Sequence, residues 1–479
     1  MPEISVTFGI VLTSVVFAFL GSYLRAHPTE VQPPLATVQA LLERHPFLDI
    51  HFASAQSVAK SLDRISTSAR KSGDGRTKGN IVFHTLPGMQ PMEVLMQRQF
   101  GSEVMVQFRH APGSRGAKQL YKIAQASLSP WTSDEYVRIY NETLRIIDEI
   151  DPALVVLDFA FRPAIDATHK RNRLHTFLTP TSLIDMLPMI QPQLNVLWKY
   201  PIVGTDFPFP IPWKNIPENI YVALRAIISF GTMSDLDETK KSIAKHGIDN
   251  AFGALNNNST SWIMQTMLEA GPTVDPIPDN VVCVNPIVSS VVTAFEQDPD
   301  LFEWLQKAST IMTGVQVLWK FGQAEYIDEA RLYLKDHIDQ GRVRIYNWLS
   351  ASPVSLLETG YISVSVHHGG ANCYNEALSA GVPQIVIPMW TDLYNYAQRV
   401  ESIGVGIYAT RGTAPEWTVK GISDAFLQVI DGGPKSSGIR ARAKYLGDVA
   451  RKNPGKYAAA NLIASLARTN NVSNAKNSR

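Results

Sequence analysis

Residues 367–381, HHGGANCYNEALSAG, combine side-chain types that can hold a phosphorylated ligand. They directly follow an apolar run, YISVSV, which is typical of a buried strand. The two glycines after His368 let the backbone approach a ligand closely, and the helix that begins near Asn372 directs free N–H groups to the same place. Glu376 lies one helical turn beyond Asn372, where its carboxylate can accept hydrogen bonds from ribose hydroxyls. The pattern predicts a pyrophosphate site.

Two other interpretations of this segment are a metal site and a polar turn without a ligand. Adjacent residues on a strand point to opposite faces, so His367 and His368 would not chelate one ion together, and no third ligand follows at helical spacing. Histidine is also not a preferred turn residue. We therefore favour the phosphorylated ligand and expect no metal.

The elements that must position these residues alternate between apolar strands and amphipathic helices. The first half has the strands FLDIHFAS, NIVFHTLPG and PALVVLDFAF, and a long helix before the last of them that Ser133 can cap. The second half repeats the alternation up to PQIVIPMW and LYNYAQRVESIG. Such alternation predicts parallel sheets with helices on both faces, and ligands bind outside the carboxyl ends of the strands. The expected fold class is α/β, with two doubly wound Rossmann-like domains facing each other across a cleft.

The length of 479 residues is too great for one ordinary domain. We expect a hydrophobic N-terminal segment at 1–25, an N-terminal domain at 26–285, a C-terminal domain at 286–465 and a disordered tail at 466–479. The middle of the chain, residues 183–280, shows little strand pattern and contains the aromatic segment KYPIVGTDFPFPIPWKNIP. This segment is either the lining of a pocket for an apolar molecule or a loop packed across the domain.

Composition excludes several classes of protein. The net charge of +1 provides no bulk attraction for nucleic acid, so we expect no nucleic-acid partner. The two cysteines, Cys283 and Cys373, provide neither a disulfide framework nor the spacing of a zinc site. A hydrophobic fraction of 45% and a charged fraction of 18% fit a globular enzyme.

The N-terminal stretch from 4 to 24 is free of charge and about as long as a membrane span. Arg25 and His27 follow it, which favours a signal anchor with a cytosolic body. The alternative is a buried parallel strand formed by SVVFAFL, residues 14–20. The expected localisation is therefore membrane-associated by a single N-terminal span, or cytoplasmic, with possible membrane association through residues 4–24.

The segment from Trp348 to Asn395 resembles the nucleotide-sugar signature of the GT-B family 1 glycosyltransferases, the UDP-glycosyltransferases. The matching residues are the tryptophan itself, HHGGANCYNEALSAGVPQIVIP from 367, and MWTDLYN from 389. The resemblance extends over about residues 35–465 and is strongest to fungal members. It implies a GT-B fold and transfer, with inversion, from a UDP-sugar to a hydroxyl of a small apolar acceptor such as a secondary metabolite, sterol or phenol. It implies no cofactor besides the UDP-sugar donor substrate.

The resemblance also implies roles for individual residues. Trp348 would stack on the uracil ring and His368 would contact the pyrophosphate. Glu376 would bind the ribose, and Asp392 would bind hydroxyls of the transferred sugar. Family members often have Gln where this chain has Leu393, so the sugar is not specified. The residues that would hold the phosphates are Gly370, Asn372 and Cys373.

The general base is the least certain part of the resemblance. The family usually has a histidine in the loop after the first strand, oriented by an aspartate at the end of a later strand. Asp158 matches that aspartate, although a helix cap or a solvated loop acid is the alternative interpretation. At the histidine position the chain has Glu30, and His27 lies three residues earlier. The base is therefore His27, Glu30, or missing.

A further departure lies near residue 311, where KASTIM joins almost directly to TGVQVLWK. Compared with the family that the chain resembles, about one strand–helix unit, which normally approaches the phosphates, is absent here. This departure leaves a second hypothesis, a catalytically impaired relative that binds nucleotide without transfer. A third hypothesis is a related GT-B enzyme that epimerises free UDP-sugars.

Overall fold

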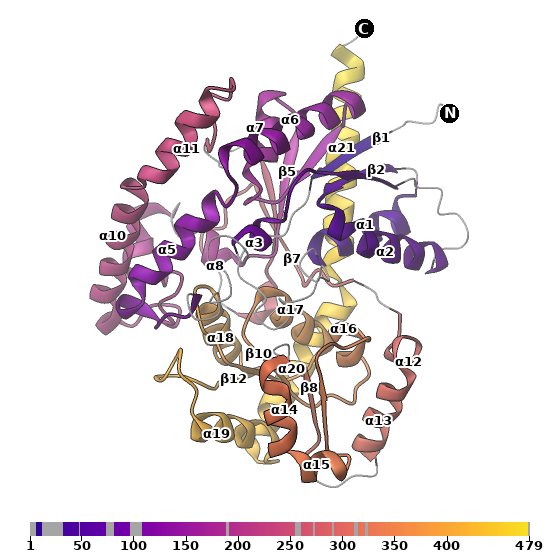
Figure 1. Cartoon of the computed structure of the whole chain (residues 1–479), viewed down its shortest axis with the longest axis vertical. Coiled ribbons are helices and arrows are strands. Elements are labelled where there is room, and N and C mark those ends of the chain that lie inside the picture. Colours follow the sequence, from indigo (N-terminus) through magenta and orange to yellow (C-terminus); the bar gives the residue numbers. More distant parts are fainter. Residues whose placement is uncertain are drawn as a thin grey trace.

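The computed structural model shows two α/β lobes, the N lobe and the C lobe, joined by segments that pass between them (Figure 1). It describes residues 6–11, 32–46, 48–72, 81–95, 108–187, 191–253, 260–271, 274–289, 292–310, 315–320 and 324–477.

The N lobe is built on a seven-stranded sheet in the order β3-β2-β1-β4-β5-β6-β7, in which every pair is parallel. The strands Leu154–Leu157, His175–Thr179 and Ser261–Gln265 are almost entirely buried, as expected when helices cover a parallel sheet on both sides, whereas the edge strand Ile81–Thr85 is partly exposed. The strands are β1 (Val6–Val11), β2 (Leu48–Ser54), β3 (Ile81–Thr85), β4 (Leu154–Leu157), β5 (His175–Thr179), β6 (Ser261–Gln265) and β7 (Val281–Val284).

The N-terminal apolar segment begins as a strand of this sheet. Val6–Val11 pairs with β2 on one side and with β4 on the other. This is the strand alternative for residues 4–24, but the strand lies earlier in the chain than the expected residues 14–20, which are outside the described residues. Among the residues that the structure describes, no helix is both long and apolar enough to cross a membrane.

Helices cover both faces of the N-lobe sheet (Figure 1). On one face, α1 (Gln32–Arg44) and α2 (Ala59–Ser72) bury an apolar stripe against β2 and β4. On the other face pack α6 (Ser133–Ile150) and α7 (Arg162–Lys170). The start of α6 differs from the prediction, because the cap is Thr132, which forms a reciprocal capping box with Glu135. The expected cap, Ser133, is the first helical residue.

The C-terminal helix α21 (Gly455–Asn477) returns to the N lobe and packs against α1 (Figure 1). Its apolar side chains recur at helical spacing and enter the core shared by α1 and β2, which corrects the expected domain end at 465. Residues 466–477 of the expected disordered tail, 466–479, belong to this helix, and the last two residues lie outside the described part of the chain. The buried residues of this stripe are Ala459, Ala460, Ile463, Ala464 and Ala467.

The middle segment is more helical than the sequence predicted. Residues 199–212, expected to be extended, form irregular chain with a turn in which the Thr205 N–H donates to the carbonyl of Ile202. The part after Trp213 forms two helices, α10 (Ile216–Gly231) and α11 (Ser234–Ala244). Pro217 occupies the first turn of α10, where a proline is compatible with a helix. The remaining N-lobe helices are α3 (Pro91–Val94), α5 (Ala117–Leu128), α8 (Leu183–Met186) and α9 (Asn195–Trp198).

The C lobe contains five described strands in two parallel ladders, β8–β9 and β10–β11–β12. Its helices pack on these ladders, which confirms the predicted α/β class. The strands are β8 (Val317–Lys320), β9 (Val343–Tyr346), β10 (Ser365–His367), β11 (Gln384–Val386) and β12 (Gly406–Tyr408). The helices, besides α21, are α12 (Ala294–Gln297), α13 (Pro299–Thr310), α14 (Ala324–Tyr333), α15 (Lys335–Asp339), α16 (Pro353–Leu357), α17 (Ala371–Ala380), α18 (Leu393–Ser402), α19 (Val419–Ile430) and α20 (Pro434–Lys452).

Candidate functional site

The start of α17 is a helix N-terminus without a side-chain cap. Strand β10 ends at His367, and Gly370 takes the N-cap position with an extended backbone but no side chain to bond the first N–H groups. These N–H groups and the positive end of the helix dipole favour an anion at this end of α17. Figure 1 shows α17 on the side of the C lobe that faces the N lobe.

Gly369 is required by the path of the turn between β10 and α17. Its φ of +96° lies in the region that residues with a side chain rarely adopt. A Cβ atom at this position would lie 2.7 Å from Val386 Cγ1 and 3.0 Å from the carbonyl oxygen of Leu393. The glycine therefore lets the turn lie directly against β11 and the start of α18.

The two histidines at the end of β10 have different surroundings. The His367 Nδ1 atom accepts the N–H of Gly369 at 3.0 Å, and its Nε2 lies 2.9 Å from Gln384 Oε1 and therefore donates to it. Burial lowers the pKa of His367 to about 4, so this ring is neutral and its role is structural. The adjacent residues therefore point different ways, as the strand pattern predicted.

The His368 ring lies 6.1 Å from the ring of Trp390, measured between centroids. Trp390 in turn contacts Phe108 of the N lobe edge to face. His368 is therefore on the side of the C lobe that meets the N lobe. Burial, with a smaller contribution from His367, lowers the pKa of His368 to about 3, so its imidazole is a neutral hydrogen-bonding group.

The first two turns of α17 carry the polar residues that the sequence singled out. Asn372 and Glu376 are both buried. Burial raises the pKa of Glu376 to about 8, which makes it a largely protonated carboxyl at neutral pH. Burial and then Glu376 raise the pKa of the Cys373 thiol, and Lys320 opposes that rise. Cys373 is therefore a neutral thiol.

Trp348 has a partner that the sequence did not indicate. The ammonium group of Lys320, the last residue of β8, lies 3.9 Å from the centroid of the Trp348 ring system. Burial lowers the pKa of Lys320, and Cys373 opposes that change. Three elements of the C lobe thus meet at one place: β8 through Lys320, the loop after β9 through Trp348, and α17 through Cys373. The signal that could have found Lys320 is its position at the carboxyl end of a strand.

The loop between β11 and α18 is held by the N lobe. The N–H of Thr391 donates to Nε2 of His110 at 2.8 Å, and the N–H of His110 donates to the carbonyl of Met389 at 3.1 Å. Nδ1 of His110 lies 2.8 Å from the carbonyl of Ala111, which fixes the neutral tautomer. Burial lowers the pKa of His110 to about 4. Thr391 has a φ of +37°, an unfavourable conformation for a β-branched residue.

Asp392 lies beside this loop and is buried. Its carboxylate accepts the hydroxyl of Thr391 at 2.9 Å. Burial raises the pKa of Asp392 well above its usual value, and Asp185 of the N lobe adds to the rise. The chain therefore places two carboxyl groups, one from each lobe, in the same buried region.

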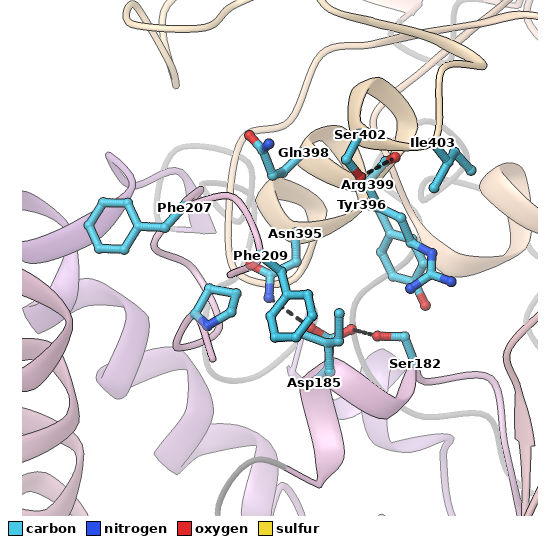
Figure 2. Close-up of a pocket in the computed structure, with 12 residues that line it drawn as sticks. Ser182, Asp185, Phe207, Phe209, Asn395, Tyr396, Gln398, Arg399, Ser402 and Ile403 are labelled. Atoms are coloured by element: carbon cyan, nitrogen blue, oxygen red, sulfur yellow. Dashed lines mark hydrogen bonds between the residues drawn. The ribbon is translucent and has the colours of Figure 1, made fainter. Parts of the chain in front are cut away.

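A small cavity of ≈ 40 Å³ lies between α18 and the N-lobe residues around α8. Figure 2 shows the Asp185 carboxylate between Ser182 and Asn395 at this cavity. It accepts hydrogen bonds from Oγ of Ser182 at 2.6 Å and from Nδ2 of Asn395 at 2.8 Å. Burial raises the pKa of Asp185 to about 6. The aromatic residues Phe207 and Phe209 also line the cavity, so part of the aromatic segment faces it.

Asp158 lies at the carboxyl edge of the N-lobe sheet, directly after β4. It is fully buried, and its Oδ1 accepts the N–H of Ala160 at 2.8 Å. Val11, the last residue of β1, pairs with Leu157, so β1 ends at the same edge as Asp158. His27 and Glu30 lie outside the described residues.

The structure brings together His368, Asn372, Cys373 and Glu376 on one turn and one helix, with Trp348 nearby. It places Asp392 on the lobe interface and Asp158 in the N lobe. Sequence reasoning missed the interface residues, among them His110 and Asp185, because pairing across the lobes leaves no periodic signal. Within the described part of the chain, no group of three or more His, Cys, Asp or Glu residues is arranged to hold a metal ion.

The chain is similar in sequence to known glycosyltransferases. Residues 327–454 match the family model described as Erythromycin biosynthesis protein CIII-like, C-terminal domain. Glycosyltransferase sdnJ from Sordaria araneosa is 29% identical, and the alignment covers 90% of this chain and 94% of that protein. A sterol 3-beta-glucosyltransferase from Komagataella phaffii is 52% identical over 48 residues, which cover 10% of this chain and 4% of that protein.

Solved structures support the fold. A UDP-glucosyltransferase from Polygonum tinctorium capable of glucosylating indoxyl, in complex with 3,4-dichloroaniline, has a TM-score of 0.60 at 15% identity over 98% of this chain and 100% of its own. Glycosyltransferase VinC, in complex with DTDP, has a TM-score of 0.51 at 14% identity over 97% of this chain and 100% of its own. At these identities the likeness concerns the two-lobed architecture.

Proposed function

We propose that this chain, which belongs to the family 1 glycosyltransferases of the GT-B fold, transfers a sugar from a UDP-sugar to a hydroxyl of a small apolar acceptor. The transfer proceeds with inversion at the anomeric carbon. The observation that carries the choice of donor is the uncapped start of α17, which lies between half-buried His368 and buried Glu376. A diphosphate needs N–H donors, and a ribose needs a hydrogen-bonding carboxyl group one turn further along the helix.

The C-lobe residues have distinct roles in this proposal. The N–H groups of the first turn of α17, with Asn372, hold the phosphate oxygens, and the neutral imidazole of His368 donates one further hydrogen bond. These donors stabilise the negative charge that grows on the leaving UDP. Trp348 stacks on the uracil, and the Lys320 ammonium beside it adds a positive charge at the same sheet edge. No metal is assigned a step.

The N-lobe residues serve the acceptor. A general base must take the proton of the acceptor hydroxyl as it attacks the anomeric carbon. Asp158 orients this base from the end of β4, and His27 and Glu30 remain the candidates for the base itself. The aromatic residues Phe207 and Phe209 bring apolar surface to the place where the lobes meet, which favours an apolar acceptor, although the ≈ 40 Å³ cavity there would have to widen to hold one.

UDP release from a panel of UDP-sugars tests the proposal, with phenols, sterols and polyketides offered as acceptors. UDP is expected only when both donor and acceptor are present. His368→Ala should lose both UDP binding and turnover, because it removes a donor that serves the ground state and the transition state. His337→Ala, a change at an exposed histidine on α15, is the matched control and should retain both.

Three other outcomes would contradict this proposal. UDP binding without release in the presence of acceptors would support the impaired relative. UDP release without any acceptor would support the epimerising class. Failure to bind any UDP-sugar would reject the assignment of the α17 site.

A further inference from the structure

The outer face of α10 exposes large apolar side chains along three turns. The exposed fractions are 49% for Tyr221, 50% for Leu224, 57% for Ile227 and 56% for Ile228, and Trp213, just before the helix, is 84% exposed. The opposite face is buried against the N lobe through other apolar residues. A helix that is apolar all round is normally buried on all sides. The outer face of α10 with Trp213, here called the α10 face, therefore lacks a covering partner within the described chain.

Helix α5 lies beside α10 and supplies positive charge. The two helices are joined by hydrogen bonds from Tyr121 to the carbonyl of Val222 and from Gln125 to the carbonyl of Ser229. Residues 113–128 and 213–231 together contain five basic residues and one acid. That acid, Glu218, already accepts hydrogen bonds from Ser114. The basic residues are Arg115, Lys118, Lys122, Lys214 and Arg225.

This local charge differs from that of the whole chain. Five bases against one acid give +4 for these two segments, whereas the whole chain has 44 basic and 43 acidic residues and a net charge of +1. An exposed apolar helix face bordered by Lys and Arg, with Trp and Tyr among its apolar residues, is typical of a helix that lies in the interface of an anionic bilayer. A second copy of the chain would bring its own +4 against the first and be repelled.

We propose that the α10 face, with the basic residues of α5 beside it, binds the surface of a lipid bilayer that contains anionic headgroups. The apolar side chains enter the boundary between headgroups and acyl chains, and the lysines contact the headgroup phosphates. This contact is independent of residues 4–24 and of the assignment of a donor or acceptor.

The position of the α10 face relates it to the cavity between the lobes. Phe207 and Phe209 line that cavity (Figure 2). Trp213 follows Phe209 four residues later in the chain. Gly204, just before the two phenylalanines, accepts the N–H of Gly113 through its carbonyl and donates to Asn395 of α18. A bilayer at the α10 face therefore lies beside the segment that lines the cavity. This arrangement would let an apolar molecule pass from lipid to protein with little exposure to water.

Co-sedimentation of the full chain with vesicles tests the proposal. Vesicles of phosphatidylcholine with phosphatidylserine are compared with vesicles of phosphatidylcholine alone, at low and high salt. We expect stronger binding to the anionic vesicles and a loss of that difference at high salt. Ile227→Gln with Ile228→Gln should weaken binding to both kinds of vesicle by about tenfold or more, because the change removes half-exposed apolar surface that the bilayer would bury.

Two further variants separate charge from apolar contact. Lys118→Gln with Lys122→Gln should weaken binding to anionic vesicles by about fivefold per charge, and leave binding to phosphatidylcholine unchanged. Leu332→Gln, at an exposed leucine on α14 of the C lobe, is the matched control and should bind like the parent. Unchanged thermal midpoints show that each variant is folded.

Each remaining outcome overturns the proposal. No binding to anionic vesicles excludes a lipid surface. Binding that the isoleucine variant does not weaken excludes the α10 face as the contact. A parent chain that is dimeric in solution, and that the isoleucine variant converts to a monomer, would assign the face to a second copy instead.

Discussion

Replacing Glu376 by Gln should make the protein more stable at alkaline pH while weakening its binding of UDP. Burial raises the pKa of Glu376 from 4.5 to about 8. Between these two pH values the folded chain keeps the Glu376 proton, whereas the unfolded chain loses it. The stability of the folded state therefore falls as the pH rises from 4.5 to about 8. A pKa rise of this size lowers the free energy of unfolding of the parent, relative to a chain whose residue 376 never ionises, by about 5 kcal/mol above pH 8 and by about 2 kcal/mol at pH 6. Gln resembles the protonated acid in shape and never ionises.

The assay is the thermal midpoint of parent and variant from about pH 5 to about pH 9. The two should nearly agree at pH 5, and the variant should melt roughly 10 °C higher at pH 9, given about 2–4 °C per kcal/mol for a lobe of this size. Glu238→Gln, at an exposed acid on α11, is the control and should show no such trend. Equal midpoints at pH 9, or a difference that does not grow with pH, would refute the reasoning. At about pH 9, where Glu376 ionises, the UDP affinity of the variant should be about tenfold lower than that of the parent, because a carboxylate accepts stronger hydrogen bonds than an amide.

Two further predictions concern the N lobe. Asp158→Asn should lower kcat by about a hundredfold or more and leave UDP affinity unchanged, because the carboxylate would orient a base and does not touch the donor. Turnover assays and isothermal calorimetry of UDP binding, measured side by side, check this prediction. A parallel loss of UDP affinity would contradict it. His110→Ala removes the acceptor of the buried Thr391 N–H and should cost about 1–3 kcal/mol, measured by urea unfolding. Burial lowers the pKa of His110 from 6.5 to about 4, so the unfolded parent binds a proton near pH 6 that the folded parent does not. The loss of stability should therefore be about 0.8 kcal/mol smaller at pH 6 than at pH 8, and a loss that is larger at pH 6 would contradict the neutral imidazole.

The regular elements were predictable where periodicity is strong. The helix from Gln32 to Arg44 and the strand from Leu48 to Ser54 are where their apolar patterns indicate. The strand before the double histidine is shorter than its pattern, since only Ser365–His367 pair with β11. The turn itself was predictable because only glycine tolerates the φ and the close contact found at Gly369.

Other elements could not be predicted from local patterns. The helix from Ile216 to Gly231 has large apolar side chains on its exposed face, so its apolar pattern does not indicate which face is buried, and the prolines before it indicate extended chain. The return of α21 to the N lobe depends on an alanine-rich stripe, Ala459–Ala467, whose partner lies more than 400 residues away in α1. Weakly apolar alanines carry little information about which surface they will contact.

The two lobes meet at the segment that the family resemblance assigns to the transferred sugar. His110 accepts the N–H of Thr391 directly before Asp392, and Asp185 accepts the side-chain N–H of Asn395 one turn after it. Asp392 is therefore held from the N lobe on both sides. Docking of the lobes also buries Asp392 near Asp185, which raises its pKa well above the usual value.

It follows that docking of the lobes would control the hydrogen-bonding character of Asp392. A docked, protonated carboxyl can donate a hydrogen bond as well as accept one, whereas an undocked carboxylate in water only accepts. In the docked arrangement, a hydroxyl of the transferred sugar would therefore meet a protonated Asp392 that can donate a hydrogen bond to it. The bond from the Thr391 N–H to His110 of the N lobe helps to hold the backbone at φ +37°, an unfavourable conformation, directly before this carboxyl.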